Sequence, residues 1–233
     1  MPIRCEDLKK IHTGFLLDFI FTVVMTAAAV ISGLMFLLSQ FLMAAMVLFL
    51  SVTISSFGAV IACIPVLLGL QRLSLFSKVF AAGKVFYMLR MILFFFCLSG
   101  YQVLIVLSGI FKGNPVLRVC SILMGHYDIL LAVLEIISVL LLLTGFDQII
   151  FRYGGADRME KSVKKFCIPY VSNYIILTVG TKIITSMHDI SPGNTTVIII
   201  SLICAASYIG YMVVEFFMLK RIRSVMKFIH ELS

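Results

Sequence analysis

The chain has 233 residues, of which 61% are hydrophobic and 13% are charged. Soluble domains carry about 25% charged residues, and a soluble protein this apolar would expose large patches and aggregate. The formal net charge of +8 does not indicate a nucleic-acid-binding protein, because the basic residues stand in short segments that flank apolar runs. That distribution is typical of the cytoplasmic loops of membrane proteins.

Six apolar runs are long enough to form membrane-spanning helices, which need about 20 residues each. The runs cover residues 14–38, 41–70, 91–111, 119–146, 167–187 and 197–219. They are continuous and lack the alternating pattern of a membrane barrel, so helices are the expected spanning form. We therefore predict an all-α, polytopic integral membrane protein. Residues 1–233 would form a single transmembrane domain of six helices, arranged as three helical hairpins.

The basic residues predict how the chain is oriented in the membrane. Sixteen of the 19 Lys and Arg residues fall before the first run, within 71–90 and 147–166, or after the last run. The other three belong to the opposite side. Because positively charged loops stay in the cytoplasm, we predict that both termini are cytoplasmic and that the protein lies in the plasma membrane.

Two acidic residues lie inside the fourth run, where ionisable groups are costly and often functional. Asp128 and Glu135 are seven residues apart, so they share one helix face about 10 Å apart along the axis. Glu135 falls near the bilayer centre. His126 lies close to Asp128, and Lys182 on the fifth helix would reach it if the two helices are neighbours.

These four residues form the candidate intramembrane polar site. One interpretation is a path for protons or cations along the acidic face. The other is that the carboxyls only hydrogen-bond to neighbouring helices and stabilise their packing. We expect two further acids to lie near the cytoplasmic surface, with Asp18 hydrated and Glu215 paired with Lys220 or Arg221.

Residues 219–233 form an amphipathic cytoplasmic tail. Its apolar positions recur at helical spacing: Leu219, Ile222, Met226 and Ile229. Its basic positions are Lys220, Arg221, Arg223 and Lys227. A basic amphipathic helix is suited to an anionic inner leaflet. The alternative is that the tail packs against the cytoplasmic ends of the other helices.

The sequence contains no motif that indicates catalysis, a metal or a cofactor. The six cysteines are scattered singly with no CxxC pair, so neither a zinc site nor a disulfide framework is predicted. No HExxH or GxSxG spacing occurs. We therefore predict that the protein is not an enzyme, has no catalytic residues, binds no metal and needs no cofactor.

Two functions remain from the sequence. The first is a non-enzymatic accessory or interaction subunit that lies in the lipid bilayer. It would bind a membrane-protein partner or form a homo-oligomer. The second is a small transporter or channel for protons, cations or a small solute, which uses the acidic face of the fourth helix. A polar path that reaches Glu135 would favour the second function over the first.

Overall fold

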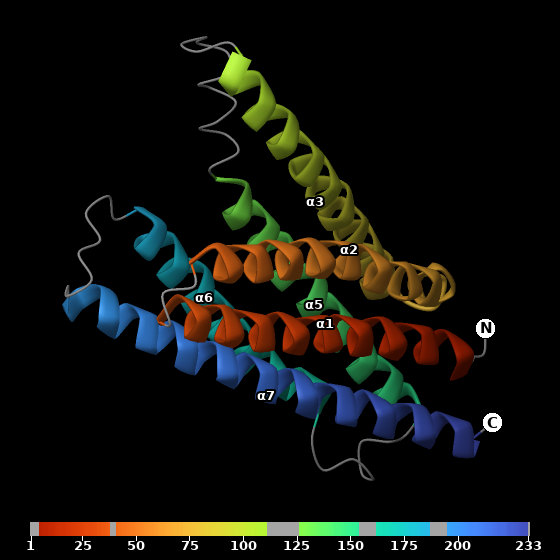
Figure 1. Ribbon diagram of the computed structural model, residues 1–233. Coiled ribbons are helices and arrows are strands. Elements are labelled where there is room, and N and C mark those ends of the chain that lie inside the picture. Colours follow the sequence, from red (N-terminus) through yellow and green to blue (C-terminus); the bar gives the residue numbers. More distant parts are fainter. Residues whose placement is uncertain (1–4, 38–40, 111–125, 154–161, 187–194, 233) are drawn as a thin grey trace.

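The computed structural model describes residues 5–37, 41–110, 126–153, 162–186 and 195–232. This part of the chain consists of long α-helices with short connections (Figure 1). The helices are α1 (Cys5–Leu37), α2 (Phe41–Leu73), α3 (Lys78–Ile110), α5 (Tyr127–Arg152), α6 (Cys167–Ser186) and α7 (Thr195–Leu232), and a 3₁₀ turn, η1 (Val163–Phe166), precedes α6.

Each α-helix overlaps one of the six apolar runs, but several extend well beyond it. Helix α1 begins at Cys5 rather than near residue 14, and α7 continues through the tail to Leu232. Helix α3 begins at Lys78, so much of the basic stretch 71–90 is helical. Hydropathy marks only the apolar part of a helix. A polar extension remains helical where one of its faces is buried against neighbouring elements.

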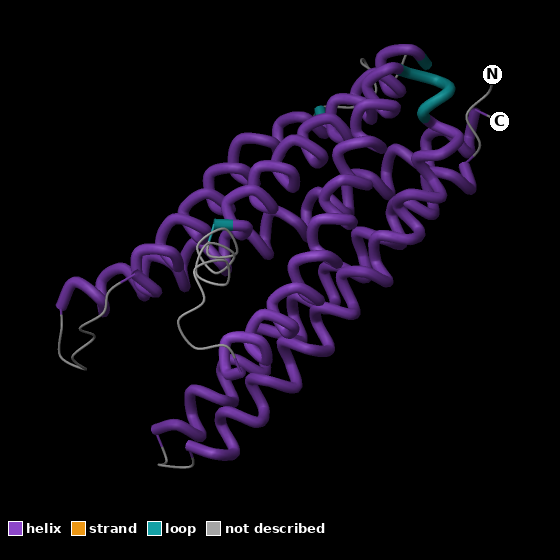
Figure 2. The backbone as a smooth tube through the Cα atoms, turned by 90° about the horizontal axis from the view of Figure 1, so that it is seen from above, coloured by secondary structure: helices purple, strands orange, loops and turns teal. Residues whose placement is uncertain are grey.

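The six helices form a ring in chain order. Consecutive helices contact each other, and α7 closes the ring by packing against α1. Both termini lie at the same end of the molecule (Figure 1). Seen from above, the helices are close together at that end and spread apart at the opposite one (Figure 2).

The apolar core lies at the end that holds the termini. Its buried members come from each of the described helices and include Leu8, Leu70, Phe80, Phe146 and Ile222. Residues from both polar extensions, at the start of α1 and the end of α7, contribute to it. The extensions therefore fold as helices because they bury an apolar stripe at this end of the ring.

The apolar face of the tail belongs to this core. Ile222 and Val225 are fully buried, and Leu219 and Ile229 are nearly so. Of the two interpretations of the tail, this arrangement agrees with packing against the helix ends. The basic residues Lys220, Arg223 and Lys227 are exposed and Arg221 is half-buried, so contact of the basic face with anionic lipid stays a prediction.

Three helices in the described part of the chain are long and apolar enough to cross a membrane. The segments are Cys5–Ala28, Ile129–Arg152 and Leu202–Glu231. Large apolar side chains also cover the surface; Leu42, Phe57, Ile168, Leu202 and Ile209 are each at least 60% exposed. Such a surface suits lipid and would be unfavourable in water.

One buried carboxylate holds the connection between α5 and α6. Asp147 Oδ1 accepts a hydrogen bond from the N–H of Val163 at 2.8 Å, and Oδ2 accepts one from the N–H of Lys164 at 3.2 Å. The hydroxyl of Ser162 donates to Oδ2 as well. These bonds satisfy the first N–H groups of η1, as a capping residue does at the start of a helix, and thereby position α6 beside α5.

Candidate functional site

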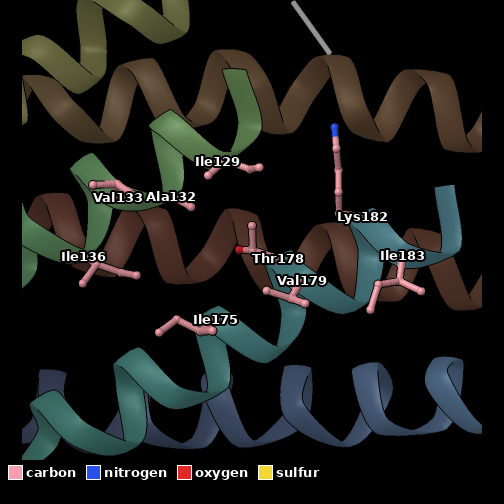
Figure 3. Close-up of a pocket in the computed structure, with 9 residues that line it drawn as sticks. All are labelled: Ile129, Ala132, Val133, Ile136, Ile175, Thr178, Val179, Lys182 and Ile183. Atoms are coloured by element: carbon pink, nitrogen blue, oxygen red, sulfur yellow. The ribbon is translucent and has the colours of Figure 1, made fainter. Parts of the chain in front are cut away.

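Of the four residues of the predicted site, the structure describes the side chains of His126, Glu135 and Lys182, and it places Glu135 and Lys182 in separate features of the fold. Lys182 lies on α6 and lines a groove between α5 and α6 (Figure 3). His126 precedes α5 and is exposed. The side chain of Asp128 lies outside the described residues, so its pairing with Lys182 stays a prediction, although α5 and α6 are neighbours.

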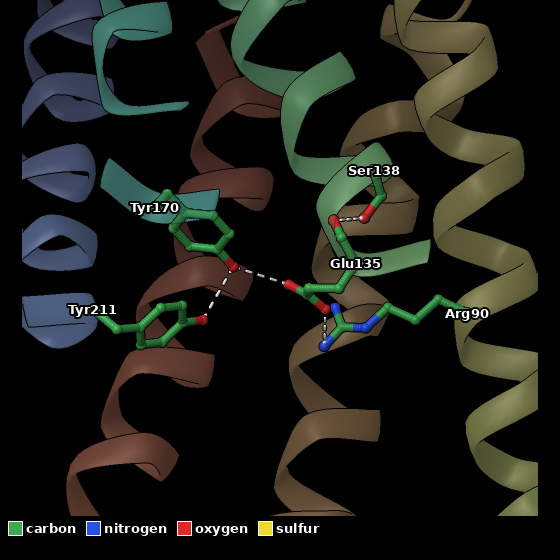
Figure 4. A network of polar contacts seen from close by, with 5 residues as sticks. All are labelled: Arg90, Glu135, Ser138, Tyr170 and Tyr211. Atoms are coloured by element: carbon green, nitrogen blue, oxygen red, sulfur yellow. Dashed lines mark hydrogen bonds and ion pairs between the residues drawn. The ribbon is translucent and has the colours of Figure 1, made fainter. Parts of the chain in front are cut away.

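Glu135 is the centre of a buried polar network (Figure 4). Its side chain is 4% exposed and forms an ion pair through Oε2 with Nη2 of Arg90 on α3. The other oxygen, Oε1, accepts a hydrogen bond from the hydroxyl of Tyr170 on α6 at 3.0 Å. Both oxygens of the carboxyl are therefore engaged, by residues of the two helices that flank α5 in the ring.

The network continues from Tyr170 to α7. The hydroxyls of Tyr170 and Tyr211 are 3.0 Å apart and share a hydrogen bond, and their rings pack with centroids 5.0 Å apart. Both tyrosines are buried. The result is a continuous chain of polar contacts across four helices, from Arg90 through Glu135 and Tyr170 to Tyr211 (Figure 4).

Two more acidic side chains lie close to this series of polar contacts. Glu215 stands four residues after Tyr211 and is only 1% exposed. It interacts electrostatically with Asp18 on α1 and with Glu135, while Asp18 interacts with Arg90. Within the described part of the protein, Oε2 of Glu215 has no hydrogen-bond partner. We call Asp18, Arg90, Glu135, Tyr170, Tyr211 and Glu215 the polar centre.

Asp18 and Glu215 lie differently from what the sequence indicated. Asp18 is partly buried and belongs electrostatically to the polar centre rather than only to a hydrated surface. Glu215 is turned into the ring beside Asp18 and Glu135 instead of standing at an interface. Both differences arise because the ring brings these acids within range of Arg90.

The polar centre holds three carboxyl groups and one guanidinium. Removing an ionised group from water is costly, and a buried pair is tolerated only when the opposite charge is close. Arg90 forms an ion pair with one of these carboxylates, so among the described residues the polar centre holds more acidic groups than basic ones. A cavity of about 30 Å³ beside Arg90 and Cys63 is large enough to hold a water molecule.

Sequence reasoning missed Arg90, Tyr170 and Tyr211. Arg90 was grouped with the basic cytoplasmic residues, whereas it lies 12 residues inside α3. The signal that would have found it is the need of Glu135 for a partner, because Arg90 is the basic residue directly before the third apolar run. The tyrosines carried no such signal, since tyrosine is common in apolar helices and at membrane interfaces.

Among the residues that the structure describes, no group of three His, Cys, Asp or Glu side chains is placed to hold a metal ion. Comparison of the chain with family models, with curated proteins and with solved structures finds no match. The function therefore has to be argued from the polar centre itself.

Proposed function

We propose that the protein is a small membrane transporter that carries protons through the polar centre. The observation that supports this most is the hydrogen-bonded chain from Glu135 through Tyr170 to Tyr211, with both steps at 3.0 Å. Carboxyl and hydroxyl groups can each donate and accept a proton, and chains of acidic residues inside membranes serve as proton relays.

Protons fit this site better than metal cations. Arg90 forms an ion pair with Glu135, and its fixed positive charge repels a second cation at the same place. A metal ion also needs several oxygen ligands arranged around one point, which the described acids do not provide. A proton needs only one acceptor, and Oε2 of Glu215 is one without a hydrogen-bond partner among the described residues.

The proposal includes six spanning helices with both termini in the cytoplasm of the plasma membrane. It is supported by the basic residues, which gather in the segments at the end of the ring that holds the termini, and by the apolar surface of the helices. We infer that α2, α3 and α6 cross the bilayer together with α1, α5 and α7, because each of them packs beside one of these three apolar helices in the ring.

The test is proton flux into liposomes that contain the purified protein and a trapped pH-sensitive dye. A potassium gradient with valinomycin makes the lumen negative, and acidification is followed over time. We expect acidification well above that of protein-free liposomes, and we expect Glu135→Gln to reduce it at least tenfold. Glu231→Gln is the matched control, because Glu231 is exposed at the end of α7. This variant should conduct protons as fast as the parent protein.

A second pair of variants tests the hydrogen-bonded chain of hydroxyl groups rather than Glu135 itself. Tyr170→Phe keeps the buried ring but removes the hydroxyl that joins Glu135 to Tyr211, so flux should fall in the same way. Tyr153→Phe, at the end of α5, should leave flux unchanged. Equal flux in the parent and in protein-free liposomes would overturn the proposal, and it would leave the accessory-subunit hypothesis with a polar centre that only stabilises packing.

A further inference from the structure

An apolar groove lies between α5 and α6 (Figure 3). Its volume is about 400 Å³. Nine described residues line it: Ile129, Ala132, Val133, Ile136, Ile175, Thr178, Val179, Lys182 and Ile183. None of them belongs to the polar centre, so the groove is a separate feature of the molecule.

The lining residues form two facing stripes. On α5 they stand at positions i, i+3, i+4 and i+7, and on α6 they stand at positions i, i+3, i+4, i+7 and i+8. Both patterns are those of a single helix face. Seven residues extend about 10 Å along a helix. Ile129, Val133, Ile175, Val179 and Ile183 are each between 42% and 52% exposed, so the groove is open along its length.

The chemistry of the lining changes at one end. Of the nine described lining residues, Lys182 is the only charged one, and Thr178 is the only other polar one. Figure 3 shows the extended Lys182 side chain with its amine directed away from the apolar lining. A ligand that matches this groove has a slender hydrocarbon part along the stripes and an anionic group near the ammonium of Lys182.

We propose that the groove holds one acyl chain of an anionic phospholipid, with the ammonium of Lys182 on the headgroup phosphate. A hydrocarbon chain fills a narrow apolar slot about 10 Å long, and a lysine near the end of a helix extends its amine to the headgroup level. Lipid surrounds this surface when the protein lies in a bilayer. The inference rests on the membrane placement proposed above but not on proton transport.

The chain contains no tryptophan, so a single introduced tryptophan reports on its own surroundings. Ile183→Trp places the reporter at the end of the groove beside Lys182. Ile199→Trp is the matched control, because Ile199 is a similarly exposed isoleucine, 51% against 42%, that lies on α7 and does not line the groove. Each full-length variant is reconstituted into phosphatidylcholine vesicles that contain a small fraction of brominated lipid, which quenches nearby tryptophan.

The measured quantity is the preference for brominated phosphatidylglycerol over brominated phosphatidylcholine. For Ile183→Trp we expect a preference of about fivefold, the size expected from one basic side chain near an anionic lipid. For Ile199→Trp the ratio should be near one. Adding Lys182→Gln to the Ile183→Trp protein should abolish the preference, whereas Lys182→Arg should retain it.

A filling variant tests the groove apart from the charge. Val179→Phe occupies the slot, so it should weaken quenching of Ile183→Trp by both lipids and leave Ile199→Trp unchanged. A ratio near one at both reporters, or a preference that survives Lys182→Gln, would overturn the lipid site. Absence of any quenching at Ile199→Trp would instead contradict the membrane placement, so the two failures are distinguishable.

Discussion

The contact between Arg90 and Glu135 has a different meaning from a surface ion pair. Exposed pairs contribute little to stability, because water already solvates both charges. This pair is largely withdrawn from water, with Glu135 4% exposed and Arg90 20% exposed at the side chain. Each residue is therefore tolerated in the interior mainly because the other is present.

This dependence predicts an asymmetry between single and double variants. Arg90→Leu leaves Glu135 without its cation and should destabilise the protein by about 3 kcal/mol, which corresponds to a fall in melting temperature of roughly 6–12 °C for a chain of this length. Arg90→Leu combined with Glu135→Leu should recover at least half of that loss, because no uncompensated charge remains.

The measurement is thermal unfolding in mild detergent, followed with a dye that reacts with newly exposed thiols. Cys63, Cys167 and Cys204 are buried, so they report unfolding without further modification. If Arg90→Leu unfolds at the temperature of the parent, the ion pair does not stabilise the fold. If the double variant is less stable than either single one, both residues contribute through packing instead.

At the scale of the elements, glycines set how closely the first two helices approach. A Cβ added at Gly69 on α2 would lie 2.5 Å from the carbonyl oxygen of Asp7 and 2.6 Å from the side chain of Ile11, both on α1. A Cβ at Gly14 on α1 would meet the backbone of α2 at 2.6 Å. These backbones can pack this closely only because no side chain stands between them.

Gly83 on α3 provides a natural contrast. A Cβ there would find its nearest neighbour, Cβ of Leu141, at 3.5 Å, which is ordinary van der Waals contact. We expect Gly69→Ala to destabilise the protein by about 1–3 kcal/mol, as overpacking does. Gly83→Ala should be neutral or should stabilise by up to about 1 kcal/mol, because alanine is the better helix former.

The same thiol-dye unfolding measurement separates these outcomes. The two variants add one methyl group each, so a difference in melting temperature reports the space available and not the chemistry of the substitution. Equal destabilisation by both would show that the approach of α1 to α2 is not the tight contact that these distances describe.

At the scale of the whole molecule, the closed ring places both termini at one end, where Val163 of η1 belongs to the apolar core. In the proposed topology this end faces the cytoplasm. A cysteine introduced at Ser162 would be a poor site for chemical labelling, because the hydroxyl of Ser162 donates a hydrogen bond to Asp147. Lys165 is exposed and gives a clearer probe of the inner side.

The topology predicts which positions react with an impermeant thiol reagent in intact cells. In a cysteine-free background, Asn114→Cys and Asn194→Cys, in the two longer outer connections expected from the sequence, should be labelled from outside. Lys165→Cys should react only after the cells are opened. Labelling of Lys165→Cys in intact cells would contradict an even number of spans with cytoplasmic termini.

Much of the helical architecture can be predicted from local sequence patterns. Long apolar runs predicted helices close to where α2, α5 and α6 lie, because the hydropathy of a segment depends only on its own residues. The spacing of Leu219, Ile222 and Ile229 likewise indicated a helix with one apolar face. The cost of an ionisable group in an apolar run was enough to single out Glu135.

Tertiary structure alone determined what the apolar face of the tail packs against and which residues bind Glu135. Whether the apolar face of the tail covers the core or a lipid surface depends on α7 returning to α1, which no local pattern encodes. The bonds of Glu135 and Tyr211 to Tyr170 join residues 35 and 41 positions apart, and Arg90 reaches Glu135 only because α3 and α5 are neighbours in the ring. Composition and spacing therefore determined that this chain is helical and apolar, whereas the closure of the ring determined which charges meet inside it, because burial and pairing depend on contacts between distant segments.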